Sequence, residues 1–355
     1  MNSNYDILGN HIRLIDSRNK DNITDRVLGI NIDKFFMPSV ANVIGTDLSR
    51  YKLITKGRFA CNPMHVGRDE RLPVALYTED EPAIVSPAYF MFEIIDNSVL
   101  DENYLMMWFR RPEFDRICWL HTDGSVRGGI TWEDICRLEL PVPPIQEQRK
   151  IVKAYKIITD RIELKKRIND NLEATAQALF KENFSVENAN SEWAVGTLQD
   201  IYTFQYGKGN NNPDNGGCYP VYGSNGIIGG FDEYNNEDAP VIGHIGINCG
   251  SLVFAFGKHF VTYNGVMCNI KNPAHKYFGY LTLTNSRLQA QVRGSSQPFV
   301  SYDMLYEIKA VIPPKEIIEY FERKITPFFD QIASNQKEKN ELVKLQDILL
   351  SELTS

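Results

Sequence analysis

Several stretches of this 355-residue chain contain residue types that do chemistry in other proteins. Gly207-Lys208-Gly209 combines a lysine with flexible glycines, but it lacks the spacing of a phosphate-binding loop and no helical pattern follows it. Asn62-Pro63 matches only half of an amino-methyltransferase signature, because the second proline and the aromatic residue are absent. The six histidines show no spacing typical of a metal site or a catalytic base. The sequence therefore predicts no enzymatic site.

Amide, hydroxyl and basic side chains read the edges of DNA bases, and in this chain they gather in Gly-rich loops. The strongest case is residues 207–212, because three successive asparagines and a lysine have little reason to cluster in a core. A plain solvated turn is the alternative. In the second half of the chain the candidate DNA contacts are Lys208, Asn210, Asn211, Asn212, Ser224, Asn225, Tyr263, Asn264, Ser295, Ser296 and Gln297.

The first half offers a second set of polar candidates. They are Lys34, Arg68, Arg71, Thr122, Ser125 and Arg127. Arg127 has the sharpest case, because its Gly-rich loop matches the loop that holds Gln297 in the second half. Residues 35–37, Phe-Phe-Met, are either a wedge into DNA or an apolar run of the core, and the core is the favoured interpretation.

The elements that position these loops are organised by a repeat. The stretch from Pro143 to Phe184 opens with a proline pair and continues with apolar residues at alternating spacings of three and four. This spacing is typical of a helix that presents one seam to another helix. The same pattern returns about 170 positions later without a gap, with Pro313 in the place of Pro143. We interpret the pattern as an internal duplication.

Each copy predicts a helix of roughly 35 to 40 residues, or about 50 to 60 Å. Proline suits the first turn of a helix, so each proline pair is expected to start one. Because a globular segment separates the copies, we expect the helices to pack antiparallel, seam to seam. The seam residues are Ile151, Tyr155, Ile158, Ile162, Leu172, Leu179, Phe321, Ile325, Phe328, Ile332, Leu342 and Leu349.

Polar residues interrupt both seams at the same two positions of the repeat. They are Lys165 and Asn169 in the first copy and Asn335 and Lys339 in the second. Buried polar seam positions favour one register over slipped ones. Pro327 lies inside the second copy, where it predicts a kink in the helix. Alternatively, Thr326 caps a new helix that begins there.

Two globular segments of similar size precede the two helices. Each contains a helical stretch, a Gly/Ser loop and a short strand that leads into the proline pair. The helical stretches are 103–118 and 277–291, and the strands are 138–142 and 308–312. Short apolar runs punctuated by Gly and Asn in residues 194–262 are typical of strands joined by tight turns.

The sequence thus predicts an α+β fold of two mixed, strand-rich domains in tandem. Each domain is followed by a long helix, and the two helices are expected to form an antiparallel coiled coil. The predicted boundaries are 1–142 for the first domain, 143–184 for the first helix, 185–312 for the second domain and 313–355 for the second helix.

Composition narrows the functional classes. An apolar fraction of 43% is typical of a globular protein, and a net charge of −7 argues against a protein that coats DNA without sequence preference. We find neither a run of eighteen apolar residues nor a signal peptide, so no transmembrane span is expected. The six scattered cysteines predict reduced thiols in a cytoplasmic protein, without a zinc site.

Five motifs point to one family. They are VPP-x-x-EQ-x-K-I-V at 142–152, N-L-E-x-x-A-Q-A-L-F at 171–180, Asn62-Pro63-Met64, Ile84–Tyr89 and Tyr219–Gly226. Together with the tandem plan, they resemble the specificity subunit of type I restriction-modification enzymes, and the resemblance spans nearly the whole chain. The second helix departs from the family motif, with Glu316-Ile-Ile-Glu319 in place of EQ-x-K-I. The resemblance of this helix therefore rests on its matching position in the repeat.

The resemblance implies that each module is a target-recognition domain for one half of a split DNA sequence, with the helices as spacer. It also implies that two adenine-methylating subunits, which carry S-adenosylmethionine, dock on the helices, and that nuclease-translocase subunits can join them. The chain itself would be non-catalytic and would hold neither cofactor nor metal. Two similar but non-identical modules suit an asymmetric double-stranded target, and partner subunits would supply the missing phosphate attraction.

Two other functions remain open at this point. One is a structural adaptor whose duplicated modules bind proteins without DNA, which suits the acidic charge. The other is an orphan specificity subunit that serves a methyltransferase without a nuclease.

Overall fold

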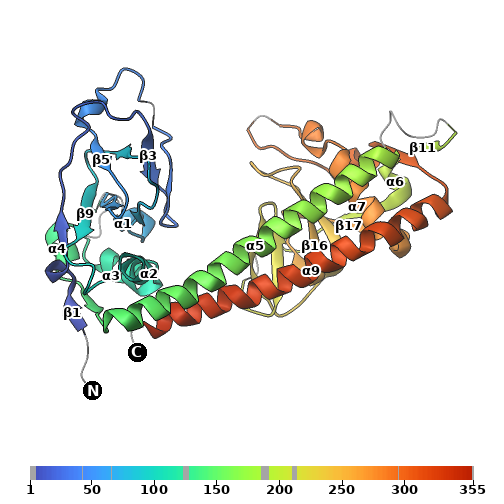
Figure 1. Cartoon of the computed structure of the whole chain (residues 1–355). Coiled ribbons are helices and arrows are strands. Elements are labelled where there is room, and N and C mark those ends of the chain that lie inside the picture. Colours follow the sequence, from blue (N-terminus) through green and yellow to red (C-terminus); the bar gives the residue numbers. More distant parts are fainter. Residues whose placement is uncertain are drawn as a thin grey trace. The chain divides into compact units, whose positions relative to one another are not determined.

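The computed structural model describes residues 5–41, 43–64, 66–122, 128–184, 192–209, 214–294 and 296–353. The chain divides into two compact units. Unit 1 consists of residues 1–163 and 340–355, and unit 2 consists of residues 164–339. Both long helices, α5 (Ile145–Phe184) and α9 (Lys315–Glu352), pass from one unit into the other (Figure 1). Within the described ranges, no helix has the length and apolar character needed to cross a membrane.

Unit 1 is built on two four-stranded sheets and a short ribbon. One sheet has the order β2 (Ile12–Leu14), β9 (Phe90–Ile94), β6 (Phe59–Cys61), β7 (Val74–Leu76), and the other has the order β4 (Phe36–Pro38), β3 (Val27–Ile30), β8 (Ala83–Val85), β5 (Lys52–Ile54). The ribbon pairs β1 (Tyr5–Ile7) antiparallel with β10 (Glu139–Pro141). The short helical elements are η1 (Leu8–Asn10), η2 (Leu48–Arg50), α1 (Val66–Asp69), α2 (Glu102–Phe109), α3 (Pro112–Leu120) and α4 (Trp132–Cys136).

The helical stretch expected at 103–118 is two helices. Asp101 accepts hydrogen bonds from the backbone N–H groups of Asn103 and Tyr104, which caps the start of α2. Pro112 then occupies the first turn of α3, a position that suits proline but cannot continue a preceding helix. The prediction of one helix was wrong for this reason, although both helices bury apolar side chains in the core of unit 1.

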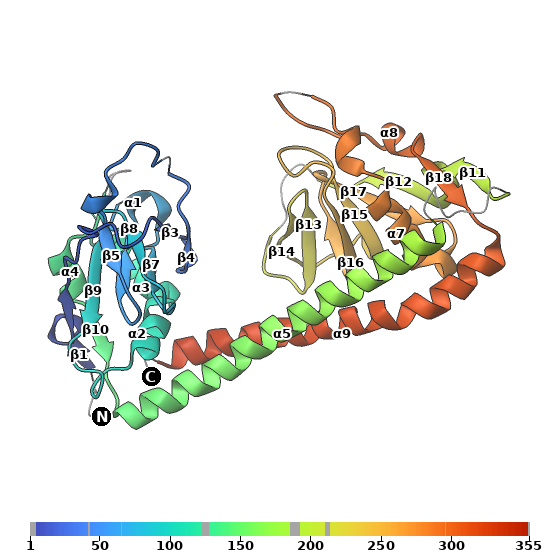
Figure 2. The ribbon, with the colours of Figure 1, turned by 45° about the horizontal axis from the view of Figure 1, so that its top comes forward.

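Unit 2 is built on one six-stranded sheet and a second ribbon. The sheet has the order β12 (Tyr202–Tyr206), β17 (Gly265–Ile270), β15 (Asn236–Gly243), β16 (Leu252–Val261), β13 (Tyr219–Gly223), β14 (Gly226–Phe231). The ribbon pairs β11 (Ala194–Thr197) antiparallel with β18 (Lys309–Ile312). The helical elements between strands are α6 (Leu198–Ile201), η3 (Pro273–His275), α7 (Lys276–Asn285), η4 (Leu288–Gln291) and α8 (Tyr302–Tyr306), as Figure 2 shows for the longer ones.

The repeat read from the sequence is present in the order of elements. In unit 1, α4 and β10 precede α5; in unit 2, α8 and β18 precede α9. The paired elements begin 170 positions apart, at 132 and 302, at 139 and 309, and at 145 and 315. In both units the strand before the long helix pairs antiparallel with a strand at the start of the module. The α+β class, with two modules that each lead into a long helix, is confirmed.

The two long helices contact each other within each unit and run in opposite directions. In unit 1, Gln346 Nε2 donates to Thr159 Oγ1 over 2.6 Å. In unit 2, Lys165 Nζ lies 2.8 Å from Glu338 Oε2, and Asn169 Nδ2 donates to the carbonyl of Ile332. All twelve expected seam residues are buried or half-buried. That the whole seam is a coiled coil stays a prediction.

Pro327 does not divide the second long helix, because α9 is continuous from Lys315 to Glu352. Thr326 does not cap a new helix. Its hydroxyl donates to the carbonyl of Glu322 one turn earlier, which is a bond made inside a helix. The alternative of a second helix start was therefore wrong.

Aromatic packing holds α7 against the long helices in unit 2. The rings of Tyr277 and Phe329 stack with centroids 4.2 Å apart, and Phe184 meets Phe321 edge to face at 4.9 Å. Phe329, which the seam pattern did not include, is almost fully buried, whereas the neighbouring Phe328 is half-buried. The same apolar core includes Phe254 of β16, so it joins the sheet of unit 2 to the two long helices.

Candidate nucleic-acid interface

The loops that carry the candidate residues of unit 2 are joined to one another by hydrogen bonds. We call them the loop surface of unit 2: residues 207–209, 224–225, 244–251, 262–264 and 293–299, of which residue 295 lies outside the described residues. Four of these segments follow the ends of strands β12, β13, β15 and β16, so the sheet positions them. The fifth lies between η4 and α8.

Backbone hydrogen bonds fix the middle of this surface. Lys208 N donates to the carbonyl of Val261, and Tyr263 N donates to the carbonyl of Gly209, which ties the first loop to the turn between β16 and β17. His244 N then donates to the carbonyl of Asn264 over 2.8 Å. Lys208 is thus brought close to Tyr263 and Asn264, which are far from it in the sequence.

The same bonding extends to the two remaining loops. Val300 N donates to the carbonyl of His244, and Gly246 N donates to the carbonyl of Pro298, next to Gln297. On the other side, Ser251 Oγ donates to the carbonyl of Ser224 over 2.9 Å. Asn225 occupies the tight turn between β13 and β14, and Gly226 beside it has φ +79°, a conformation that favours glycine.

The rings of Tyr206 and His244 pack beside Tyr263. The ring of Tyr206 lies 4.3 Å from that of His244 and 5.8 Å from that of Tyr263, centroid to centroid. His244 is itself buried, with Nδ1 2.6 Å from the carbonyl of Val300, and Tyr302 packs on Tyr206 at 4.8 Å. Burial raises the pKa of Tyr206. Tyr263 itself is 39% exposed beside this packing, so its side chain is accessible for stacking or hydrogen bonding to nucleic acid.

Most of the described candidates of unit 2 lie on the outer side of this surface. Lys208, Asn225, Tyr263, Ser296 and Gln297 are exposed, and Ser224 and Asn264 are half-buried. Asn210, Asn211, Asn212 and Ser295 lie outside the described residues. The geometry gathers the predicted readers of unit 2 in one place, which suits a surface that contacts DNA.

Sequence reasoning missed three exposed side chains of the same loops, namely Ile247, Arg293 and Phe299. Ile247 is 96% exposed, and the signal for it was an apolar residue set between the turn glycines Gly246 and Gly250. Arg293 and Phe299 exchange backbone hydrogen bonds across the base of the last loop, so their positions depend on a pairing that single residues do not reveal.

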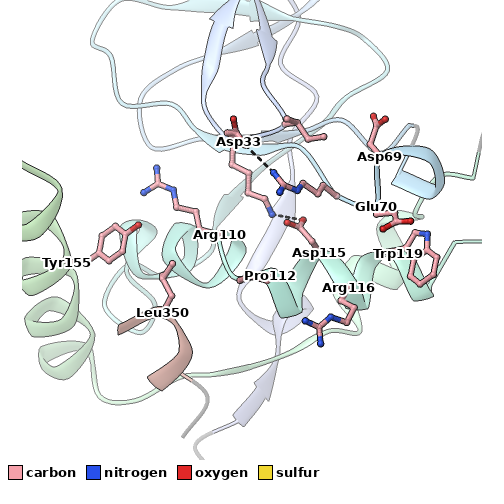
Figure 3. Close-up of a pocket in the computed structure, with 13 residues that line it drawn as sticks. Asp33, Asp69, Glu70, Arg110, Pro112, Asp115, Arg116, Trp119, Tyr155 and Leu350 are labelled. Atoms are coloured by element: carbon pink, nitrogen blue, oxygen red, sulfur yellow. Dashed lines mark hydrogen bonds and ion pairs between the residues drawn. The ribbon is translucent and has the colours of Figure 1, made fainter. Parts of the chain in front are cut away.

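In unit 1 two candidates, Lys34 and Arg71, line a charged pocket of about 570 Å³. The turn between β3 and β4, the segment after α1 and helix α3 line it, and Figure 3 shows Asp33, Arg110 and Asp115 at its wall. Arg71 Nη1 pairs with Asp33 Oδ1 at 3.1 Å, and Arg68 pairs with the adjacent Asp69. Both arginines are exposed, and such surface pairs are worth only about 0 to 1 kcal/mol, so both remain free to exchange partners with DNA phosphate.

Lys34 does not fit the role that the sequence suggested. It is 5% exposed, and its ammonium donates to the carbonyl of Phe109 and to Asp115 Oδ1, both at 2.6 Å. Burial lowers its pKa, while the charge of Asp115 opposes that shift. A buried ammonium held by two internal acceptors is not available to a base, so Lys34 stabilises the pocket wall instead.

Thr122 is the remaining first-half candidate that lies within the described residues. Thr122 follows α3, and its hydroxyl donates to the carbonyl of Trp119, which lines the pocket. Ser125 and Arg127 lie outside the described residues. The segment that follows them is anchored beside α1, because Gly67 N donates to the carbonyl of Gly128 and Ile130 N to that of Pro63. Phe36 and Met37 are half-buried in β4, and Phe35 is 49% exposed.

Neither unit shows the arrangement of a metal or redox centre among the described residues. No group of three or more His, Cys, Asp or Glu side chains there is placed to hold a metal ion, and all six cysteines are free. Burial raises the pKa of Cys61 to about 12, so this thiol is not a reactive thiolate.

Comparison with known proteins identifies the family. The family of the type I restriction modification DNA specificity domain matches residues 75–174 and 190–344, more than half of the chain. The type I restriction enzyme MjaIX specificity subunit of Methanocaldococcus jannaschii is 25% identical over 307 residues, which are 73% of this chain and 70% of that protein. The HindI specificity subunit of Haemophilus influenzae is 28% identical over 184 residues, 50% of this chain and 39% of that protein.

A solved structure shares the fold. The crystal structure of the type I restriction-modification S subunit from M. genitalium superimposes with a TM-score of 0.58 at 19% identity, over 98% of this chain and 95% of that one. Members of this family recognise the target and leave the chemistry to other subunits. The chain belongs to the family of type I restriction-modification DNA specificity domains and is a non-catalytic specificity subunit.

Proposed function

We propose that this subunit reads a split double-stranded DNA target, with the module of each unit reading one half-site. The observation that carries the proposal is the loop surface of unit 2. Hydrogen bonds bring Lys208, Tyr263 and Gln297 to one rigid, exposed surface at the ends of the strands. Their ammonium, phenol and amide groups are the types that contact phosphates and base edges.

The repeated order of elements supports one reader per module. Each module leads through a short helix and a paired strand into its long helix, at the same offset in the sequence. The side chains of the candidate readers differ between the modules, with arginines in unit 1 and amides in unit 2. Two related surfaces of different chemistry suit two different half-sites rather than a palindrome.

The long helices are the proposed spacer and docking site for partners. Each carries exposed apolar side chains beside its seam, among them Ile157 on α5 and Ile348 on α9, which a docked subunit would cover. Two adenine-methylating subunits that bind S-adenosylmethionine are the proposed partners, and nuclease-translocase subunits would complete a restriction complex. This chain holds no cofactor in the proposal, and the complex would act on DNA in the cytoplasm.

The partner subunits would also compensate for the weak attraction between this acidic chain and DNA phosphates. A net charge of −7 gives this chain little attraction for phosphates, so the methylating subunits are expected to supply most of the non-specific affinity. Sequence specificity would then come from the candidate readers of the two modules, and most of the DNA affinity from the methylating subunits bound to this chain.

Sequencing of N6-methyladenine in cells that express this chain with its methylating partner tests the proposal. We expect one motif with two defined halves separated by a gap of fixed length. Absence of methylation at any bipartite motif, with stable protein and an active partner, would contradict DNA reading and favour a DNA-independent adaptor. Methylation without restriction of incoming DNA would identify a methylation-only system.

A further inference from the structure

Ile247 stands out on the loop surface of unit 2 because it is an aliphatic side chain left 96% exposed among polar loops. Leaving such a side chain in water gives up the free energy that its burial would provide. Single exposed apolar residues are common on protein surfaces, so Ile247 is singled out by its fixed position among the candidate base readers rather than by exposure alone. The described exposed loop residues around it include the polar or charged Gln297 and Lys208, and Phe299 is a second apolar residue there, at 39% exposure.

The loop holds Ile247 in a fixed position. Gly246 N donates to the carbonyl of Pro298, and Gly250 N donates to the carbonyl of Gly243, both over 2.9 Å. Inside the loop, Cys249 N donates to the carbonyl of Gly246, and the thiol of Cys249 is directed at the carbonyl of His244. Gly246 and Gly250 have φ values of +91° and +78°, which a residue with a Cβ adopts only with strain. A β-branched side chain on such a loop has few rotamers to lose on binding.

The position of Ile247 identifies the chemistry of its partner. Its loop is bonded to the loop of Gln297 through Gly246 and, through His244, to the turn of Tyr263 and Asn264, so it lies among the proposed base readers. At the groove edges of DNA the bases present hydrogen-bonding groups and one apolar group, the C5-methyl of thymine in the major groove.

We propose that Ile247 is a specificity-determining residue that packs against the C5-methyl group of a thymine in the half-site read by unit 2. The proposal rests on the proposed function, since it requires unit 2 to read DNA. It assigns the apolar contact to Ile247 and leaves hydrogen-bond readout to the amides around it.

Competition binding with the full chain in complex with its methylating subunits tests this assignment. Each thymine of the second half-site is replaced in turn by deoxyuridine, which lacks only the methyl group. At one position the wild-type complex should bind the deoxyuridine site about fourfold more weakly, the effect of losing one buried methyl group. Ile247→Ala should bind the thymine site more weakly by at least that factor and should lose nothing further with deoxyuridine at that position, because the two changes remove one contact.

Val195→Ala is the matched control, because Val195 is an exposed aliphatic residue of unit 2 on β11, outside the loop surface. It should retain the full sensitivity to deoxyuridine. The assignment is overturned if no thymine position is sensitive, if the half-site contains no thymine, or if Ile247→Ala stays as sensitive to deoxyuridine as the wild type. Failure to bind any bipartite site would instead contradict the proposed function itself.

Discussion

At the scale of single residues, the loop surface of unit 2 separates side chains that hold the fold from side chains that are offered to a partner. His244 is buried and packs on the half-buried Tyr206, whereas Lys208 and Gln297 are exposed. Lys34 in unit 1 belongs to the first class, although its charge alone would place it in the second. Burial and hydrogen bonding, rather than residue type, decide which residues can read DNA.

Lys208→Ala should weaken DNA binding by the complex about equally for all sequences. An exposed lysine acts on phosphate as a point charge, so its loss should reduce the slope of log affinity against log salt by about one. Titrations at several salt concentrations measure both quantities. Lys309→Ala, an exposed lysine on β18 away from the loop surface, should leave the slope unchanged. A loss confined to one DNA sequence would show that Lys208 reads a base instead.

The sequence located the polar loops but did not reveal how buried each of their side chains is. Polar side chains in Gly-rich loops identified the segments that the structure joins, because turn residues are local signals. The burial of Lys34 depends on Asp115, which lies on another element and is invisible to local pattern. Ile247 was missed because an isolated isoleucine reads as core unless the loop around it is known.

At the scale of elements, a polar network crosses the helix pair of unit 2. Asn335 is 1% exposed. Its side-chain Nδ2 donates to Asn169 Oδ1, and its side-chain Oδ1 accepts from Lys165 Nζ. Lys165 and Asn335 are equivalent positions of the repeat, 170 residues apart, and they contact each other directly. In an antiparallel pair of repeated helices, equivalent residues meet only at the local twofold point, so this network marks the register.

Asn335→Ala should lower the free energy of unfolding by about 1 to 3 kcal/mol, because Asn169 and Lys165 lose buried hydrogen-bond partners. Denaturant unfolding of the full chain measures the change. The control is Ser334→Ala, an exposed neighbour on the same helix, which should change stability by less than about 0.5 kcal/mol. Equal effects of the two substitutions would show that the network contributes nothing to stability.

Glu322 links α9 to the start of α7. Glu322 is 7% exposed, and its Oε1 accepts a hydrogen bond from Phe278 N over 2.7 Å. Phe278 lies in the first turn of α7, and His275, the residue before this helix, provides no side-chain cap. Burial raises the pKa of Glu322 to about 7, against the lowering effect of the backbone N–H groups of Phe278 and Tyr277 and the charge of Lys276. Glu322 also lines a pocket of unit 2, together with Glu319, Arg323 and Asp330.

Stability of unit 2 should therefore fall as Glu322 ionises. Since the folded pKa of about 7 exceeds the ordinary value of 4.5, the contribution of Glu322 is complete below about pH 4.5 and is lost as pH rises through 7. Glu322→Gln keeps an acceptor for Phe278 N and removes the titration. Its stability relative to the wild type should rise by up to about 3 kcal/mol between pH 4.5 and pH 8.

Urea unfolding at several pH values measures this difference. Glu316→Gln, which changes an exposed carboxyl group on the first turn of the same helix, is the control and should follow the wild-type pH profile. An unchanged pH profile in Glu322→Gln would show that Glu322 is not the titrating group.

Element types followed from local signals more reliably than element boundaries. The seam spacing and the proline pairs predicted both long helices, which begin at Ile145 and Lys315, just after the prolines. The break between α2 and α3 was missed because apolar spacing continues across Pro112. The sequence allowed a new helix start at Thr326 beside the expected single helix. It could not decide between them, because packing of Phe329 and Ile325 in the core holds α9 together despite Pro327.

At the scale of the whole molecule, the proposed function requires two DNA-reading modules joined by a spacer. Duplication was visible in the sequence because the offset is uniform, and the order of elements follows it. The sheets of the two modules differ, with two four-stranded sheets in unit 1 and one six-stranded sheet in unit 2. Sequence patterns do not report strand order, because pairing depends on contacts between distant residues.

Lengthening both helices should change the gap of the DNA target and leave its half-sites unaltered. Four residues inserted next to Lys165 and four next to Asn335 add about 6 Å to each helix, which corresponds to about two base pairs. Methylation motifs before and after insertion provide the measurement. Altered half-site sequences, or an unchanged gap in an active complex, would contradict the role of the helices as spacer.

The most direct test of the central claim is an exchange of one module. Residues 1–142 are replaced by the corresponding module of another specificity subunit, and N6-methyladenine is mapped in cells that also express the methylating partner. One half of the motif should change to that of the donor, while the half read by unit 2 and the length of the gap stay the same. A change in both halves, or in neither, would contradict the claim that each module reads its own half-site.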